Sequence, residues 1–279
     1  MSLKNRIISL LASKGVEMSM QEIYKHFPEF VKTTVRGRVY DSLGKGVERV
    51  GNGLYISAEA IVEHGSALEI VDRLVDEGET FDFIFLDIPY EAAGQKGGNR
   101  NLFDCDKISP EQFGEFIKKC ETLLKDDDSP LAFMFTTGKS SKVAHDKYIS
   151  KIGLKQCSVI GTYKKLWPNG NPMNMGKYLM PIENIYFFTR SGELKPDLKI
   201  PNLDFALTPD IKEYPTAKPY SMIEKIVSVF TKEKDWVFDP FGGSGKILKA
   251  CLNLNRFCHT IDISETSIQK HMIPLLANK

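Results

Sequence analysis

The stretch Asp239–Gly245, which reads Asp-Pro-Phe-Gly-Gly-Ser-Gly, constrains the fold more than any other part of the chain. It follows the short apolar run 236–238 and precedes a helical pattern that begins near Lys246. The next apolar run, 259–261, ends at Asp262. This order of strand, glycine turn, helix and second strand ending in an acid is typical of a nucleotide-type cofactor site. The glycines let a ligand approach the backbone, and the acid can accept hydrogen bonds from ribose hydroxyls. An ordinary strand-to-helix turn is the alternative for this segment alone.

A second stretch, Asp87-Ile-Pro-Tyr90, follows the buried apolar run 81–86. In open α/β sheets, ligands bind at the carboxyl ends of the strands. Asp87 and the carbonyl before Pro89 can accept hydrogen bonds from an exocyclic amine, and Tyr90 offers a face for stacking. These residues therefore suit a flat substrate that carries an amino group. A buried aromatic at a strand end, with Asp87 capping a turn, is the alternative.

Length and composition limit the classes of protein that the chain can belong to. The 279 residues allow one large domain and a small one, with a net charge of only +1. The five cysteines form no C-x-x-C pair, so we expect no disulfide framework and no metal site, in keeping with a reducing cytosol. No signal peptide and no apolar run of membrane-spanning length is present, which predicts a cytoplasmic protein without a membrane partner.

The first 57 residues differ in charge from the remainder. They hold nine Lys/Arg and five Asp/Glu, whereas the rest of the chain is slightly acidic. Their pattern predicts a helix over 3–14, a helix capped by Ser19 and Glu22, a third helix capped by Thr33 or Thr34, and a β-hairpin over 47–56. Three helices and a hairpin resemble a winged helix-turn-helix domain, whose third helix enters a DNA groove. A winged helix that docks onto protein is the alternative.

Between the two motifs the apolar pattern predicts alternating strands and helices of an α/β domain over residues 58–279. The glycine-rich loop 91–110 can act as a lid or contact nucleic acid, with simple disorder as the alternative. The polar stretch 190–214 is predicted to be an excursion from the core.

Taken together, the motifs resemble those of the DNA adenine-N6/cytosine-N4 amino-methyltransferases in their β-type order, where the catalytic motif precedes the cofactor motif. Four segments carry the resemblance over roughly residues 60–270: Asp87–Tyr90 (family Asp-Pro-Pro-Tyr), Trp167–Arg190 (an aromatic loop, then Glu-x-Ile-x-x-Phe-x-Lys), Thr216–Pro219 (Thr-Gln-Lys-Pro) and Phe238–Gly245 (Leu-Asp-Pro-Phe-x-Gly-Ser-Gly). The resemblance implies a Rossmann-like, mostly parallel sheet with helices on both faces, S-adenosylmethionine as cofactor, and double-stranded DNA as partner.

The resemblance also implies roles for individual residues. Asp239 would orient the amino end of the cofactor, Lys218 would neutralise its carboxylate, and Asp262 would bind its ribose. The candidate catalytic residues are Asp87, Ile88, Pro89 and Tyr90. The candidate cofactor-binding residues are Thr216, Lys218, Asp239, Pro240, Phe241, Gly242, Gly243, Ser244, Gly245 and Asp262. The candidate nucleic-acid-binding residues are Lys32, Thr33, Thr34, Arg36, Arg38, Arg49, Lys96, Arg100, Lys164 and Lys165.

Three positions depart from the family pattern: Ile88 replaces a proline, Ala217 replaces a glutamine, and Ser66 stands where an aspartate is usual. An aspartate at the start of the catalytic motif accompanies adenine more often than cytosine in the family, so adenine N6 is the expected target. Cytosine N4, RNA, and an inactive winged-helix regulator are the alternatives. The short excursion 190–214 is the place where this group carries its target-recognition region. Many members form dimers, and the resemblance leaves a homodimer open.

Overall fold

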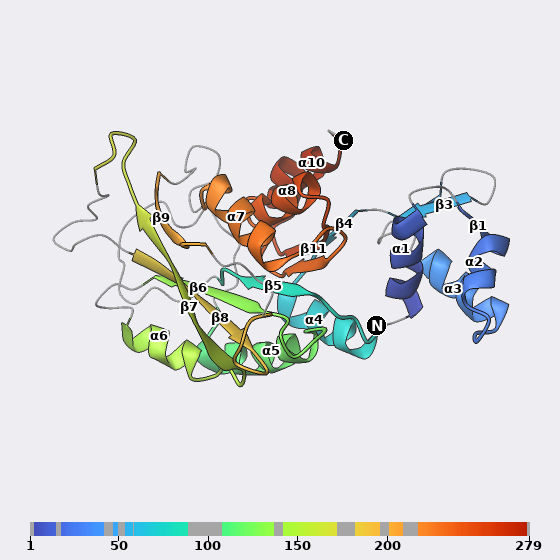
Figure 1. Ribbon diagram of the computed structural model, residues 1–279, viewed down its shortest axis with the longest axis horizontal. Helices are drawn as coiled ribbons and strands as arrows, with labels where there is room; N and C mark the ends of the chain where they lie inside the picture. The colour runs from blue at the N-terminus through green and yellow to red at the C-terminus, as the bar shows by residue number, and fades with distance from the viewer. Residues whose placement is uncertain are drawn as a thin grey trace.

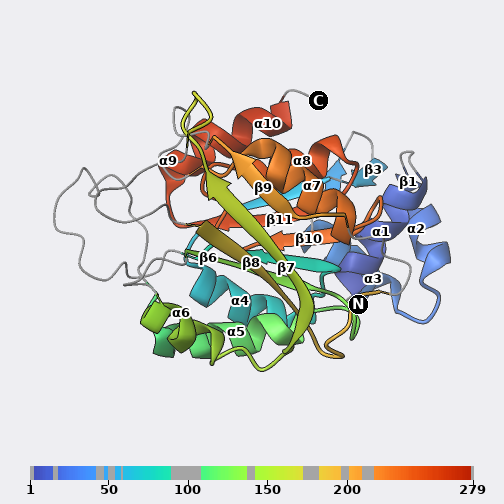
Figure 2. The same ribbon diagram turned by 60° about the vertical axis from the view of Figure 1, so that its left-hand side comes forward.

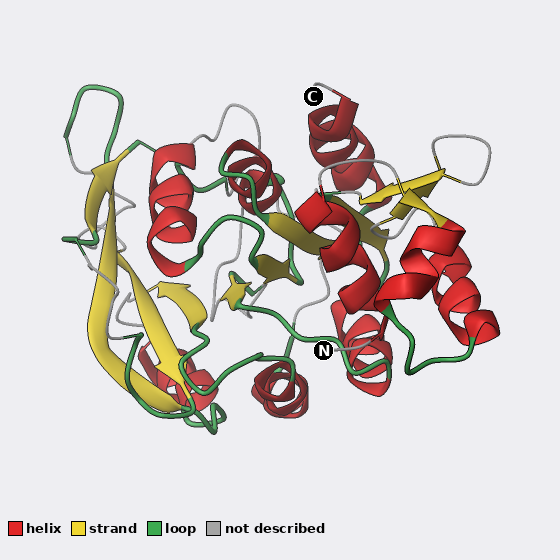
Figure 3. Ribbon diagram, turned by 45° about the vertical axis from the view of Figure 1, so that its right-hand side comes forward, coloured by secondary structure: helices red, strands yellow, loops and turns green. Residues whose placement is uncertain are grey.

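The computed structural model describes most of the chain. The described residues are 3–14, 18–41, 47–49, 54–57, 59–88, 108–136, 142–171, 182–195, 201–208 and 217–277. They form two β-sheets, one of three strands and one of eight. The small sheet and three helices belong to the first 57 residues, here called the N-terminal unit, and Figure 3 shows the short strands of this sheet on the right.

The N-terminal unit contains the helices and the hairpin that its sequence predicts. Its helices are α1 (Leu3–Lys14), α2 (Met20–His26) and α3 (Lys32–Asp41), and its strands are β1 (Met18–Ser19), β2 (Val47–Arg49) and β3 (Leu54–Ser57). Strands β2 and β3 pair antiparallel, and β1 adds to the other side of β3.

The sequence predicts the capping residues of two helices in this unit, and the structure confirms those of α2. The Ser19 hydroxyl accepts from the backbone of Glu22, whose side chain accepts from the backbone of Ser19, so the predicted capping box at α2 is confirmed. The predicted caps of α3 are wrong, because that helix begins at Lys32 and Thr33 and Thr34 lie within its first turn. The amides of Thr34 and Val35 donate to the Val31 carbonyl, so the helical hydrogen bonds begin before either threonine could cap the helix.

The large sheet has the order β4-β11-β10-β5-β6-β8-β7-β9, and β8 alone runs against its neighbours. Its strands are β4 (Ala60–His64), β5 (Phe83–Leu86), β6 (Leu131–Thr136), β7 (Lys155–Lys165), β8 (Ile182–Thr189), β9 (Asp204–Leu207), β10 (Trp236–Asp239) and β11 (Phe257–Asp262). The helices that follow or connect them are α4 (Ala67–Asp76), α5 (Pro110–Thr122), α6 (Lys142–Ile149), α7 (Tyr220–Phe230), α8 (Lys246–Asn253), α9 (Glu265–Ser267), the π-helix η2 (Ile268–Met272) and α10 (Ile273–Ala277). The predicted mostly parallel α/β sheet is confirmed.

Helices cover both faces of this sheet. Helices α4, α5 and α6 lie on one face, and α7, α8 and α10 lie on the other (Figures 1 and 2). Strand β5 shows why: Ile84 and Leu86 join one hydrophobic cluster, while Phe83 and Phe85 join the other. A strand that is apolar on both sides needs cover on both sides, as in other parallel sheets.

One strand was missed by the sequence analysis. Residues 190–214 were predicted to leave the core, but β9 within them pairs in parallel with the end of β7 and forms the edge of the large sheet. The hydroxyl of Thr162 donates to the Asp204 carboxylate at 2.6 Å across this pairing. The four residues of β9 are too few to show an alternating pattern from which a strand could be predicted. Pairing with β7 holds them in the strand conformation.

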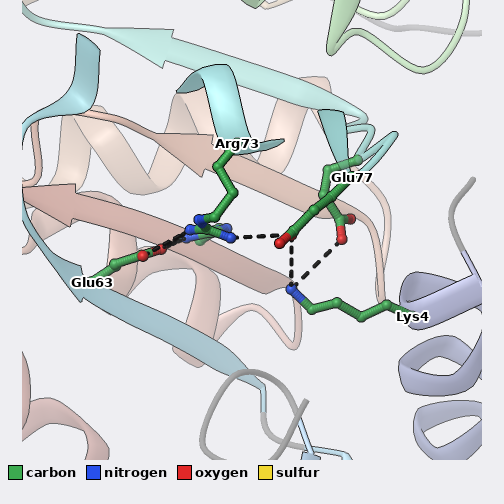
Figure 4. A network of polar contacts seen from close by, with 6 residues as sticks. Lys4, Glu63, Arg73 and Glu77 are labelled. Atoms are coloured by element: carbon green, nitrogen blue, oxygen red, sulfur yellow. Dashed lines mark hydrogen bonds and ion pairs between the residues drawn. The ribbon is translucent and has the colours of Figure 1, made fainter. Parts of the chain in front are cut away.

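An ion-pair network joins the N-terminal unit to the α/β domain (Figure 4). The Lys4 ammonium lies 3.8 Å from Glu77 and 3.6 Å from Glu79, just beyond the end of α4. Arg73 contacts Glu77 at 3.1 Å and Glu63 of β4 at 2.7 Å. Although burial raises the pKa of Glu63, its hydrogen bond to His259 and the charge of Arg73 lower that pKa to about 2. The unit is thereby attached at the end of the sheet where β4 and β5 begin.

Two expectations from composition concern the described residues. Cys120, Cys157, Cys251 and Cys258 are buried free thiols. None of the helices in the described part of the chain combines the length and the apolar character that crossing a membrane requires.

Candidate active site

Three aspartates lie at the carboxyl ends of three neighbouring parallel strands. Asp87 comes directly after β5, Asp239 ends β10, and Asp262 ends β11. The chain proceeds from β10 to its neighbour β11 on one side and from β5 to its neighbour β6 on the other. The boundary between β10 and β5 is therefore a topological switch point, where α/β sheets bind ligands in the crevice outside the strand ends.

The glycine turn lies between β10 and α8, as predicted. Gly243 and Gly245 have φ angles of 48° and 69°, and Gly245 is the N-cap of α8. These angles lie in the left-handed region of backbone conformations, which a residue with a Cβ rarely adopts, so glycine is favoured at both positions. The Asp262 carboxylate accepts the amide of Gly243 at 2.6 Å and that of Ser264 at 2.7 Å. The turn and the acid thus form one rigid unit, with further lone pairs of Asp262 available to a ligand's hydroxyls.

Gly242 has no room for a side chain, which yields a first prediction. A Cβ there would lie 2.4 Å from Oγ1 of Thr260 and 2.5 Å from Cε of Met272. We expect Gly242→Ala to lower the free energy of unfolding by about 2 kcal/mol, because the turn must shift away from β11 and η2. Chemical denaturation measures this loss. Gly37→Ala is the matched control, since nothing lies within 4 Å of a Cβ at Gly37; equal losses in the two variants would contradict the prediction.

Asp239 is a buried carboxyl group that needs a cationic partner. Asp239 is 3% exposed, and its Oδ1 accepts a hydrogen bond from the backbone amide of Phe241 at 3.2 Å. Burial, followed by the negative charges of Asp262 and Asp87, raises the pKa of Asp239 to about 8 against the effect of that hydrogen bond. A ligand with a positive charge would stabilise the carboxylate form. The site therefore fits S-adenosylmethionine, which carries a sulfonium and an ammonium group beside ribose hydroxyls.

Asp87 lies in a chain of alternating charges. The Lys218 ammonium is 2.7 Å from Oδ2 of Asp87 and 3.6 Å from Oε2 of Glu183, and the Lys165 ammonium is 2.6 Å from Oε1 of Glu183. Burial raises the pKa of Asp87, while the Lys218 charge opposes that rise. Ile88, which follows, is buried. These contacts link β5, β7, β8 and the start of α7 at the same edge of the sheet.

This chain of charges contains two of the residues predicted from sequence. Lys218, predicted to neutralise the carboxylate of the cofactor, contacts Asp87. Lys165, predicted to bind nucleic acid, contacts Glu183. Both roles remain predictions. Glu183 itself was overlooked as a site residue. A carboxylate at the start of the apolar strand β8 was the available signal, because buried acids require a charged partner.

The remaining candidates divide into three groups. Pro240, Phe241 and Ser244 lie in or beside the glycine turn, next to Asp239. Exposed residues of α3 and of the end of β7 include Lys32, Thr33, Thr34, Arg36, Arg38 and Lys164. Arg49 lies on β2, without a described side chain, and Pro89, Tyr90, Lys96, Arg100 and Thr216 lie outside the described residues.

Comparisons with known proteins agree with this geometry. A sequence model of the family described as DNA methylase, comprising N6 and N4 methyltransferases, matches residues 182–272, from β8 through η2. The type II methyltransferase M2.DpnII of Streptococcus pneumoniae is 26% identical over 227 residues, covering 68% of this chain and 80% of the relative. The type II methyltransferase M.HpaI of Haemophilus parainfluenzae is 40% identical over 58 residues, covering 21% and 18%.

Solved structures share the fold of the chain. The M1.HpyAVI–SAM complex has a TM-score of 0.55 at 21% identity, covering 76% of this chain and 98% of its own. The cytosine-N4-specific PvuII DNA methyltransferase has a TM-score of 0.56 at 13% identity, covering 80% and 87%. The matched family segment contains the glycine turn, Asp239 and Asp262. Residues 182–272 thus match the DNA methylase family of N6 and N4 methyltransferases, and the chain shares its fold with solved methyltransferase structures.

Proposed function

We propose that the protein transfers a methyl group from S-adenosylmethionine to the exocyclic amine of a base in double-stranded DNA, with N6 of adenine as the preferred target. The observation that carries this proposal is the meeting of Asp87, Asp239 and Asp262 at the switch point of the sheet. One acid then faces the substrate amine while the other two serve the cofactor. The preference for adenine rests on the aspartate at the start of the catalytic motif.

The chain's own residues would hold the cofactor in a defined pose. Asp262, fixed by two backbone amides, would accept the ribose hydroxyls. Asp239 would face the cationic amino end, and the bare backbone of the glycine turn would pass beside the methionine part. When bound, S-adenosylmethionine supplies an already activated methyl group on a sulfonium. The protein therefore contributes positioning and charge placement more than acid–base strength.

The target base must leave the duplex stack, because its amine is otherwise out of reach. The Asp87 carboxylate and the Ile88 carbonyl would accept its two amino hydrogens, and Tyr90 would stack on its ring. These contacts draw the nitrogen lone pair out of conjugation and aim it at the methyl group. The bond from nitrogen to the methyl carbon would form as the bond from sulfur breaks, so the donor would leave as a neutral thioether and the methylated amine would release its extra proton to water.

Nucleoside analysis tests the proposed reaction directly. The protein is incubated with S-adenosylmethionine and unmethylated duplex DNA, and the digested product is analysed by mass spectrometry. N6-methyladenine is the expected product, and N4-methylcytosine would instead assign the alternative base. Product on RNA alone would overturn the assignment to DNA. An absence of both product and cofactor binding would favour an inactive regulator.

We further propose that the N-terminal unit is a winged helix-turn-helix that binds the DNA backbone. Lys32, Arg36 and Arg38 are exposed on α3, and their charge suits phosphates. Figure 1 shows α3 on the side of α1 that faces away from the large sheet. The surface is therefore accessible to a duplex.

Charge reversal on α3 gives a second prediction. We expect Lys32→Glu/Arg38→Glu to weaken DNA binding about tenfold at 0.1 M salt and to reduce the slope of log K against log salt by about 2, as two lost phosphate contacts would. Fluorescence anisotropy with a labelled duplex measures both quantities. Lys118→Glu/Lys147→Glu, which reverses two exposed lysines of α5 and α6, is the control with the same change in net charge. Equal weakening in both variants would refute a specific role of α3.

A further inference from the structure

We infer that Glu183, with Lys165 and Lys218, positions the Asp87 carboxylate for its contact with the substrate amine. This inference rests on the proposed methyl transfer, in which Asp87 is the catalytic carboxylate. Glu183, Lys165 and Lys218 are positioning residues, because they act through Asp87. The four side chains come from segments far apart in the sequence and meet at the carboxyl edge of the sheet.

Burial shows that the arrangement is specific. The side chains of Glu183, Lys218 and Lys165 are 6%, 13% and 22% exposed. Ions withdrawn from water lose several kcal/mol of hydration, and only close partners offset the loss. Glu183 therefore holds an ammonium on each carboxylate oxygen, Lys165 on Oε1 and Lys218 on Oε2. Two carboxylates and two ammonium groups make the chain of charges neutral, so neither lysine carries an uncompensated charge into the site.

The geometry assigns different tasks to the two oxygens of Asp87. Oδ2 contacts the Lys218 ammonium at 2.7 Å, which fixes the rotation of the carboxylate. Within the described ranges, Oδ1 has no hydrogen-bond partner, so it can accept an amino hydrogen of the base. Glu183 holds Lys218 from the opposite side. Removing Glu183 would take one acid away from Lys218 and strengthen the pairing of Lys218 with Asp87 at the expense of the substrate contact.

The neighbouring charges influence Asp87 in opposite directions. After burial, the Lys218 charge lowers the pKa of Asp87, Glu183 raises it, and Lys165 lowers it. Asp239 on the adjacent strand β10 is a further acid close enough for its pKa to be raised by Asp87. The ionised Asp87 carboxylate accepts the amino hydrogen more strongly than the neutral acid does, so protonation of Asp87 would lower kcat and give the acidic limb of its pH profile.

Single and double substitutions test the inference. In Glu183→Gln we expect kcat to fall between about 10- and 100-fold, with the acidic limb of its pH profile moved to lower pH. In Lys165→Met we expect a loss of kcat with the acidic limb moved to higher pH. The double variant restores the charge balance, so its acidic limb returns close to that of the wild type. The Kd of S-adenosylmethionine, measured by calorimetry, should change less than threefold in all three.

Controls separate this inference from the proposed function and from misfolding. Lys155→Met changes an exposed lysine on the same strand β7 and should leave the pH profile unmoved. Thermal unfolding of each variant checks the fold, and if Glu183→Gln does not fold, the more exposed Lys165→Met carries the test. A wild type without methylated product refutes the proposed function. An active wild type whose two single variants show no shift, or shifts in the same direction, overturns the positioning role alone.

Discussion

Replacing Asp87 with alanine is expected to reduce methyl transfer by roughly 1,000-fold or more while S-adenosylmethionine still binds. The substrate amine loses its acceptor, and Lys218 turns from a partner of Asp87 into a cation facing the amine. A single-turnover assay with labelled cofactor measures the rate, and calorimetry measures cofactor binding. The two readouts separate a lost chemical contact from a lost binding site.

Two variants accompany this measurement. Asp87→Asn keeps the shape and one oxygen acceptor but removes the charge, so its rate should lie between those of the wild type and the alanine variant. Asp72→Ala removes an exposed carboxylate of α4 that pairs with Lys119, and it should leave the rate unchanged. Wild-type-like turnover of Asp87→Ala would sink the proposed role of Asp87.

Replacing Asp239 with asparagine is expected to stabilise the ligand-free protein at pH 9 and to weaken binding of S-adenosylmethionine at least about 100-fold. The folded-state pKa of about 8 lies above the usual value of 3.8, so the folded protein holds this proton more tightly than the unfolded chain. The stabilisation is complete below pH 4 and is lost as the pH rises through 8. Asparagine removes that loss, because it cannot ionise.

Thermal unfolding across pH 5–9 measures the effect. At pH 9 without ligand, Asp239→Asn should unfold roughly 5 °C above the wild type, which corresponds to about 2 kcal/mol, and the gap should narrow toward pH 5. Added S-adenosylmethionine should raise the midpoint of the wild type alone, since its cationic end compensates the Asp239 carboxylate. A variant that is less stable than the wild type at pH 9 would show that the ionised carboxyl group is already well compensated without ligand.

The features that were predictable from sequence are local ones. The segment from Trp236 to Asp262 shows its structure in consecutive residues. It contains an apolar run, glycines at positions of positive φ, a helical pattern and a second apolar run. Each of these patterns has a short-range cause, so the strand, turn, helix and terminal acid lie where expected. The capping box of Ser19 and Glu22 was predictable for the same reason.

The features that were missed depend on segments brought together by the fold. Strand β9 exists because β7 offers an unpaired edge, which the sequence of residues 204–207 does not reveal. The contact of Lys218 was not predictable because its partner, Asp87, lies 131 positions away, directly after β5. Glu183 escaped notice because its two lysine partners come from β7 and from the start of α7.

The attachment of the N-terminal unit has a consequence for the DNA that the protein can use. The unit joins the domain where β4 and β5 begin, whereas the three site aspartates follow the ends of β5, β10 and β11. The six residues of β11 span about 20 Å between these two edges. Duplex DNA has a persistence length of about 150 base pairs, so a short, straight fragment cannot fold back from one edge to the other.

With the proposed contact between α3 and DNA, one molecule would engage two separate stretches of DNA, one against α3 and one at the carboxyl ends of the strands. Gripping the first stretch would raise the local concentration of neighbouring DNA to the millimolar range that short tethers produce. The protein would then behave as a tethered scanner on long or densely packed DNA, with faster methylation per site there than on isolated oligonucleotides of the same sequence.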